Sequence, residues 1–312
     1  FVQYHPTCLP GSGILMTEGC RGEGGILVNR DGYRYLQDYG LGPLDPWPRP
    51  KAMELGPRDR LSQAFWHERQ KGRTVDTPHG PAVHLDLRHL GEKKIHERLP
   101  LIAEAAETFA GVDPVKDPIP VCPAVHYTMG GILTDGRCQT PIQGLFAAGE
   151  CSSVGIHGAN RLGSNSLAEL LVFGRLAGEG AATVAAERGR GQADTATLKQ
   201  AEDAERRILA WLDPARNAGP GAERPATIRD EMRVAMEDGV GIYRDEKGMQ
   251  ATCDKLAELR ERYRRVRIDD HSLAFNTDWL TTLELGYSLE VAQAMAHSAL
   301  QRKESRGAHQ RL

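Results

Sequence analysis

The residues best suited to chemistry in this sequence gather around Arg161, in the run HGANRLGSNSLAEL at His157–Leu170. Glycines in and before this run permit a close-packed loop, and the apolar run after Ser164-Asn165-Ser166 predicts a helix with a Ser or Asn N-cap. Free N–H groups and the dipole at a helix start attract anions, and a guanidinium can bind a carboxylate or a phosphate. The alternative, equally weighted at this point, is that Arg161 and His157 are loop surface residues joined by ordinary glycine turns.

A second group of ionisable residues lies nearer the N-terminus. A short helix expected over Ile14–Gly19 brings Thr17, Glu18 and Arg21 close together, because residues three apart share a helix face. These residue types can bind a substrate carboxylate or move a proton. The alternative is a solvated Glu–Arg pair, which usually contributes little to stability.

Three further candidates lie at the edges of expected elements. Arg58 falls in the first turn of a helix expected over Pro57–Gln70, where a cation opposes the helix dipole and so hints at a function. His5 follows an alternating strand over Phe1–Tyr4, and His126 lies just before a double glycine. Two of the three have a plain alternative: Arg58 points to solvent, and His126 is a core histidine with its ring satisfied.

The elements that must position these residues can be read from the periodicity. An alternating pattern predicts a half-buried strand over Pro81–His89, and Gly144–Glu150 is expected to form a short buried strand. The apolar stripe over Gly91–Ala110 contains a proline and predicts two helical pieces, the second starting at Pro100. Near the C-terminus, three helical stripes predict an antiparallel bundle; they begin at Ile228, Met249 and Trp279.

Composition excludes several classes of protein. The chain has 312 residues, 40% of them hydrophobic and 26% charged, as expected for a globular protein of about two domains. Lys plus Arg number 39 against 42 Asp plus Glu, so the net charge of −3 argues against broad nucleic-acid binding. We expect no direct membrane span, no secretory leader and no metal site. The six cysteines are scattered and are expected to be reduced thiols.

Several motifs occur in one order and together are specific. They are HPT at His5, TEGCRGEGG at Thr17–Gly25, LGPRD at Leu55–Asp59, HYTMGGI at His126–Ile132, GECSSVGIHGANRLGSNSL at Gly149–Leu167 and KESRGAH at Lys303–His309. With them the chain resembles, over nearly its whole length, the flavoprotein subunit of the fumarate reductase and succinate dehydrogenase family. The stretch Ile14–Gly40 is most similar to the bacterial quinol:fumarate reductase branch.

The resemblance implies a fold of the α/β plus α+β class. A partial, doubly wound FAD-binding domain, residues 1–5 and 127–187, would be interrupted by a capping domain, residues 6–126, and followed by an incomplete C-terminal helical-bundle domain, residues 188–312. The family's glycine-rich phosphate loop and the histidine that carries FAD covalently do not occur in this sequence. The chain is therefore expected to be an internal fragment that is inactive and binds FAD poorly by itself. Cys8 stands where the family commonly has glycine.

The activity implied is the flavin-dependent interconversion of fumarate and succinate, with a hydride from N5 of reduced FAD and a proton from an arginine. By resemblance, His126 and Arg161 would bind one substrate carboxylate, and His5 with Thr17 the other. Arg58 would deliver the proton, and the further catalytic residues would be His5, Glu18 and Arg21. Preorganised cations of this kind stabilise charge that develops on the substrate.

The resemblance also assigns cofactor residues and partners. Glu150, Ser166, Leu167 and Arg161 would contact FAD, and the partners would be an iron–sulfur subunit and membrane-anchor subunits. This subunit would lie peripherally on the cytoplasmic side of the bacterial inner membrane, as the catalytic subunit of a membrane-associated complex of anaerobic respiratory electron transport. Alternatives are the succinate dehydrogenase direction, an L-aspartate oxidase-like enzyme, or a non-catalytic docking subunit. The enzyme reading requires five side chains to converge: His5, Thr17, Arg58, His126 and Arg161.

Overall fold

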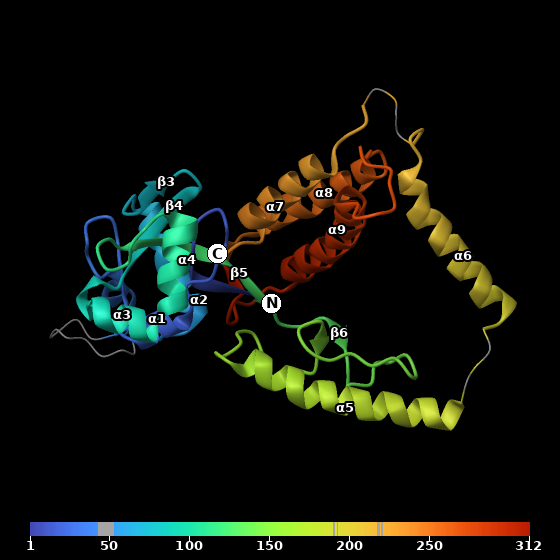
Figure 1. The fold of residues 1–312 in the computed structure, drawn as a ribbon, viewed down its shortest axis with the longest axis horizontal. Coiled ribbons are helices and arrows are strands. Elements are labelled where there is room, and N and C mark those ends of the chain that lie inside the picture. The colour runs from blue at the N-terminus through green and yellow to red at the C-terminus, as the bar shows by residue number, and fades with distance from the viewer. Residues whose placement is uncertain (43–52, 190, 192, 217–218, 220) are drawn as a thin grey trace. The chain divides into compact units, whose positions relative to one another are not determined.

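The chain divides into two compact units in a computed structural model that describes residues 1–42, 53–189, 191, 193–216, 219 and 221–312 (Figure 1). The first unit comprises Phe1–Ala181 with Arg306–Ala308, and the second comprises Ala182–Ser305 with His309–Leu312. Strands and helices mix in the first unit, whereas helices dominate the second. The boundary between a capping and an FAD-binding domain inside the first unit stays a prediction.

The first unit is built on an antiparallel sheet with strand order β1-β5-β4-β2, in which β3 also pairs with β4. Its strands are β1 (Val2–Cys8), β2 (Ile26–Val28), β3 (Val75–Thr77), β4 (Gly80–Asp86) and β5 (Ile119–Thr128). The strand expected over Pro81–His89 is confirmed as β4, and the strand expected at the N-terminus continues through Cys8. Pairing of β1 with β5 sets His5 opposite Ala124, and thus near His126.

Helices pack on this sheet around one apolar core, which includes Leu27, Leu61 and Leu85. They are α1 (Glu18–Gly22), η1 (Tyr35–Tyr39), α2 (Arg58–Gln70), η3 (Arg88–Leu90), α3 (Glu92–Arg98) and α4 (Pro100–Ala110). The break at Pro100 is confirmed, because proline cannot continue α3 but suits the first turn of α4.

The short helix is expected over Ile14–Gly19, but in the structure it lies at Glu18–Gly22. The Met16 N–H donates to the Thr7 carbonyl at 2.9 Å, and this bond keeps the chain beside β1 until Thr17. The helix α1 therefore begins only at Glu18, with Thr17 as its N-cap.

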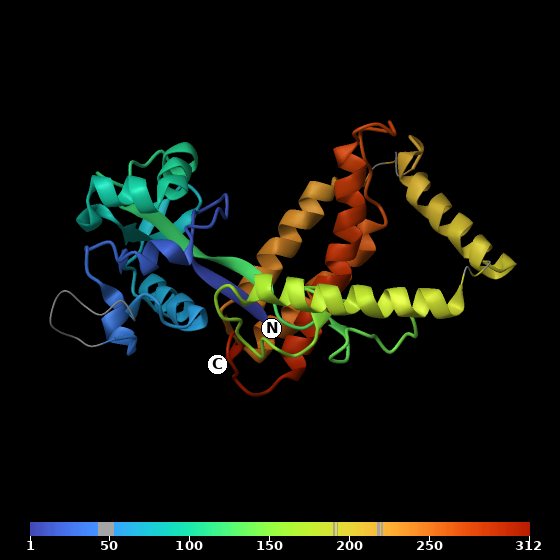
Figure 2. The ribbon, with the colours of Figure 1, turned by 60° about the horizontal axis from the view of Figure 1, so that its bottom comes forward.

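The strand expected over Gly144–Glu150 is also wrong. Gly144 and Gly149 both adopt positive φ, and between them only Phe146 forms a bridge, with Gln139. The parallel pair nearby is β6 (Ile132–Leu133) with β7 (Ser152–Ser153). The chain between β6 and β7 lies along helix α5 (Asn165–Arg188) (Figure 2). There the Cys138 thiol donates to the Phe173 carbonyl at 3.3 Å.

The second unit contains the expected bundle, formed by α7 (Pro225–Gly239), α8 (Glu246–Tyr263) and α9 (Thr277–Gln301) packed side by side (Figure 1). Ile228, Met249 and Leu256 are fully buried in its core, which confirms the stripes of α7 and α8. The stripe expected to run from Trp279 through Tyr287 and Val291 is wrong, because both of these side chains are exposed and α9 buries Leu285 and Leu289 instead. The remaining elements are α6 (Thr195–Leu209), η4 (Ala210–Leu212), β8 (Tyr243–Arg244) and β9 (Gln310–Arg311). In the described parts of both units, every helix is too short or too polar to cross a membrane.

Candidate functional site

Arg58 is held at the start of α2 by partners from two other elements. Its Nε and Nη2 donate to the same Glu18 oxygen at 3.1 and 3.0 Å, and its Nη1 donates to Gln3 Oε1 at 3.2 Å. The side chain of Glu18 is 40% exposed, whereas that of Arg58 is 10% exposed. Arg21 lies beyond Glu18, with its Nη2 3.7 Å from the same carboxylate oxygen. The carboxylate thus links two buried cations to solvent.

His5, His126 and Arg161 form the second part of the site. The two imidazole rings contact edge to face with centroids 5.2 Å apart, and Arg161 Nη2 donates to His126 Nε2 at 2.9 Å. The loop that carries Arg161 also reaches the first part of the site. A Cβ added to Gly163 would lie 3.2 Å from Glu18 Oε1 and 3.6 Å from Arg58 Nη2.

Four of the five predicted side chains therefore converge through direct contacts or one shared neighbour, namely His5, Arg58, His126 and Arg161. Thr17 is exposed and directly precedes Glu18. His5 is 1% exposed. Arg161 is 5% exposed and the side chain of His157 is 8% exposed, so neither of these two is a loop surface residue. Buried donors without hydrogen-bond partners remain at His5 Nε2, at Arg161 Nε and at Arg21 Nη2. Such donors suit an anionic ligand, because an unmatched buried donor is costly.

The electrostatics of the site favour an anion. Burial, followed by the charges of Arg21 and Arg58, lowers the pKa of His5 to about 2. Burial with Arg58 and Arg161 lowers the pKa of His126 to about 4. Burial and the charge of Arg58 also lower the pKa of Arg161. Both histidines are therefore neutral near pH 7, and the Glu18 carboxylate pairs with the guanidiniums of both Arg58 and Arg21, while Arg161 adds a third guanidinium, so the cluster favours an anion.

Gln3 is a residue of this cluster that the periodicity did not single out. It is fully buried; its Oε1 accepts from Arg58, while its Nε2 donates to Asn160 Oδ1 and to the Arg161 carbonyl, both at 2.6 Å. Asn160 in turn donates to Asp59 Oδ1 at 2.8 Å. The side-chain amide of Gln3 thus holds the Arg58 guanidinium in place relative to the backbone at Arg161. The sequence signal that could have identified Gln3 is its position two residues before His5 on the same strand, because side chains two residues apart in a strand point to the same face.

A second network, also missed, lies behind Arg161. Its guanidinium stacks on the Tyr127 ring at 4.3 Å, and the Tyr127 hydroxyl donates to Glu169 Oε2 at 2.8 Å. His157 Nε2 lies 2.6 Å from the same oxygen. Burial and the bond to Glu169 raise the pKa of Tyr127 to about 12, so its hydroxyl stays a donor. The stack and the bonds restrict where Arg161 can point.

The predicted cofactor residues border the same loop. Ser166 and Leu167 lie in the first turn of α5, where Leu167 is 68% exposed, and the exposed Glu150 accepts the Thr128 N–H at 2.8 Å. Gly131 has a φ of +133°, and a Cβ there would lie 2.3 Å from the Cys151 carbonyl oxygen. The N-terminal end of α5 with its dipole, the buried Arg161 Nε that lacks a hydrogen-bond partner and the backbone passage at Gly131 that only glycine permits fit a dinucleotide with an electron-rich ring.

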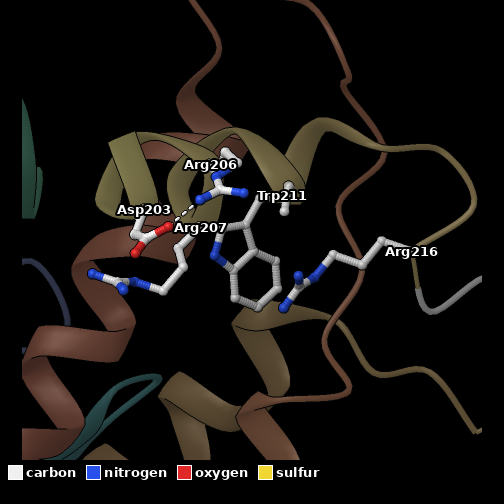
Figure 3. A pocket seen from close by; sticks show the side chains of 6 residues that line it. Asp203, Arg206, Arg207, Trp211 and Arg216 are labelled. Atoms are coloured by element: carbon white, nitrogen blue, oxygen red, sulfur yellow. Dashed lines mark hydrogen bonds and ion pairs between the residues drawn. The ribbon is translucent and has the colours of Figure 1, made fainter. Parts of the chain in front are cut away.

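Among the described residues, cavities lie both beside the Tyr127 network and in the second unit. One of about 110 Å³ lies beside the network of Tyr127, and His157, Glu169, Gly130 and Gly155 are among its lining residues. The other, of about 550 Å³, lies in the second unit (Figure 3). There Arg216 stacks on Trp211 at 3.8 Å, and Arg206 is paired with Asp203. The predicted site residues line neither cavity; the first touches the Tyr127 network through His157 and Glu169, whereas the second shares no residue with it.

Titration of His126 tests the electrostatics directly. We expect its imidazole to stay neutral from about pH 8 to about pH 5 and to titrate near 4, because burial and two cations disfavour the charged form. Histidine resonances assigned in nuclear magnetic resonance spectra would report the midpoint. Replacement of Arg161 by leucine should raise it. A midpoint near 6.5 in the unsubstituted protein would show that the site is not desolvated and cationic.

Two known protein families match this chain, one in its N-terminal half and one near its C-terminus. A family described as "FAD binding domain" matches residues 1–167, and one described as "Fumarate reductase flavoprotein C-term" matches residues 229–312. The fumarate reductase flavoprotein subunit of Serratia sp. (strain ATCC 39006) is 66% identical over 314 residues, which cover 100% of this chain and 52% of that protein. The succinate dehydrogenase flavoprotein subunit of Coxiella burnetii is 42% identical, with 100% and 52% covered.

The similarity extends to three dimensions. A solved structure of Escherichia coli quinol fumarate reductase superposes with a TM-score of 0.93 at 66% identity. The match covers 100% of this chain and 53% of that one. The chain thus spans about half the length of the curated relatives it matches. These matches confirm the expected fold class, an FAD-binding domain with a C-terminal flavoprotein domain.

Proposed function

Because the chain belongs to the family of fumarate reductase and succinate dehydrogenase flavoprotein subunits, we propose that it serves the interconversion of fumarate and succinate. The single observation that carries the proposal is the convergence of Arg58, Arg161, His5 and His126 on one largely buried, positive cluster. A docking subunit needs no such cluster. Two carboxylates at the ends of a short, rigid substrate need fixed donors at two places, and the cluster offers both.

The substrate is bound, in this proposal, by donors that are already oriented. Arg161, held by Tyr127, and His126 bind one carboxylate, and His5 with Thr17 binds the other. His5 Nδ1 faces the Thr7 N–H at 3.3 Å, which places the ring proton on Nε2, the nitrogen without a partner. A neutral imidazole can thus donate to a carboxylate. These contacts strengthen as charge develops on the substrate during reduction.

FAD, when bound, supplies the two electrons of the reaction as a hydride. Glu150, Ser166, Leu167 and Arg161 would hold it, and the α5 N-terminus favours negative charge on the ring. Arg58 supplies the proton to the other substrate carbon, and Glu18, 3.0 Å away and partly exposed, returns a proton from solvent. Arg21 steadies the Glu18 carboxylate from the buried side. Succinate oxidation follows the same path in reverse.

We further propose that the chain acts within a membrane-associated respiratory complex, peripheral to the membrane. The support is similarity to flavoprotein subunits and to a quinol fumarate reductase. An iron–sulfur subunit and membrane-anchor subunits are the partners expected, on the cytoplasmic side of the bacterial inner membrane.

The test is an assay of the protein that carries this chain, with FAD present, in both directions. Fumarate should oxidise a reduced viologen, and succinate should reduce a quinone-like dye. The amount of viologen oxidised should match the succinate formed, and the amount of dye reduced should match the fumarate formed. L-aspartate in place of succinate is the matched control for an oxidase of amino acids. Flavin-loaded protein that reduces no fumarate and oxidises no succinate would overturn the proposal.

Glu18→Gln tests the relay within this proposal. The amide keeps the size of the side chain but cannot carry a proton back to Arg58, so we expect turnover to fall about tenfold or more. The solvent isotope effect on turnover should rise, because proton return then limits the rate. Glu23→Gln, at the other end of α1, removes a carboxylate that pairs with Arg98 and should leave both quantities unchanged. Equal effects of the two substitutions would count against the relay.

A further inference from the structure

Two of the six cysteines lie directly opposite each other on the two strands that carry the site histidines. Cys8 ends β1 and is the Cα partner of Cys122 in the antiparallel pairing with β5. The pairing shifts between His5 and Cys8, so that Pro6 and Thr7 oppose Pro123 alone, and it returns to register at the cysteine pair. Cys8 also forms a bridge with Leu15 on its other side, which fixes the end of β1.

The geometry of such a pair fits a disulfide. Directly opposite residues of an antiparallel pair have Cα atoms about 4.5–5.5 Å apart and side chains on the same face. Disulfides span Cα distances of about 4.4–6.8 Å, so the bond requires rotation of the side chains and little movement of the backbone. Both cysteines carry reduced thiols in this structure. We propose that Cys8 and Cys122 are an oxidation site, at which a hydroperoxide converts the two thiols into a cross-strand disulfide.

The two cysteines differ in access, and this sets the order of steps. Cys8 is 3% exposed, whereas Cys122 is partly exposed at the margin of the first unit's core. The peroxide oxidises Cys122 to a sulfenic acid and leaves as water or an alcohol. Cys8 then attacks the Cys122 sulfur, the S–S bond forms, and the sulfenic hydroxyl leaves as water with the Cys8 proton. Two thiols lose two electrons and two protons, and the peroxide is reduced.

The burial of Cys8 slows the second step, the attack of its sulfur on the Cys122 sulfur. Burial and the neighbouring Cys122 raise the pKa of Cys8 to about 12, so Cys8 is a thiol at neutral pH and a slow nucleophile. A sulfenic acid at Cys122 should therefore accumulate before the disulfide forms. The bond would join β1 and β5 three residues beyond His5 and four residues before His126. It would also remove the Cys8 thiol that faces the His5 carbonyl oxygen at 3.9 Å.

The experiment treats the chain with hydrogen peroxide and maps its peptides. A Cys151→Ser background removes the exposed cysteine, which would otherwise link two molecules. We expect two fewer titratable thiols, a cross-linked peptide that contains Cys8 and Cys122 and is lighter by two hydrogens, and full reversal by dithiothreitol. With Cys8→Ser, dimedone should instead trap a stable sulfenic acid on Cys122. Cys253→Ser, at a buried cysteine of the second unit, should leave the cross-link unchanged.

Two results would overturn the proposal. One is folded protein, checked by circular dichroism, in which Cys122 is oxidised while Cys8 remains alkylatable after denaturation, even once the oxidation has run to completion. The other is an equal yield of the adduct with and without Cys8 when dimedone is added only at that end point. The first can be measured even if Cys8→Ser folds poorly, because it uses only the Cys151→Ser background.

Discussion

Replacement of Arg58 by alanine is expected to reduce fumarate turnover by about 10²–10⁴-fold, because it removes the group that supplies the proton. A guanidinium normally keeps its proton, with a pKa above about 12. The substrate carbon is, however, a strong base once the hydride has arrived, so the loss of a proton by Arg58 can be brief. Glu18 contacts two nitrogens of Arg58 and can restore the proton. Turnover with reduced viologen, and fumarate binding from changes in the flavin spectrum, are the measurements.

The control for Arg58→Ala is Arg60→Ala, on the same first turns of α2 but exposed. That variant should retain turnover. Arg58 also anchors Gln3, so thermal unfolding must show that Arg58→Ala is folded. If fumarate binds and turnover is largely kept, water supplies the proton, and Arg58 only stabilises charge.

Replacement of Arg161 by lysine should have the second largest effect, a loss of about 2–4 kcal/mol in transition-state binding. The charge is kept, but an ammonium cannot reproduce the planar arrangement of donors that contacts His126 and stacks on Tyr127. We expect KM for fumarate to rise and kcat to fall, because the same group binds the substrate and stabilises its developing charge.

Arg175→Lys is the matched control for Arg161→Lys. Arg175 lies on α5 with a side chain 79% exposed, paired with Glu179, and its replacement should leave kcat/KM within about twofold. Near-normal kcat and KM in Arg161→Lys would show that Arg161 does not bind the substrate.

Local patterns predicted the helices well, for a physical reason. The stripes through Ile228 in α7 and through Met249 and Leu256 in α8 recur every three to four residues, and these two helices bury them in the bundle. Pro100 likewise marks a helix start, because proline fits the first turn, and Pro57 is the N-cap directly before α2. Such signals depend on neighbouring residues in the sequence.

The contacts that assemble the site do not depend on neighbouring residues, and periodicity could not predict them. Arg58 and Glu18 are 40 residues apart, and Arg161 and His126 are 35 apart. Their proximity follows from the pairing of β1 with β5 and from the buried amide of Gln3, which no local pattern specifies. The resemblance to a family supplied these residues, whereas composition and spacing left each of them with a plain alternative. The misplaced α1 has the same origin, since the Met16–Thr7 bond is a tertiary contact.

The most direct test of the central claim is an experimental structure of the FAD-loaded protein that carries this chain, determined with fumarate bound. One carboxylate should lie within hydrogen-bond distance of Arg161 and His126, and the other should lie near His5 and Thr17. The Arg58 guanidinium should face a carbon of the double bond, with Glu18 still bound to its far side. Fumarate bound elsewhere, such as at Trp211 and Arg216 in the second unit, with this cluster empty, would contradict the account.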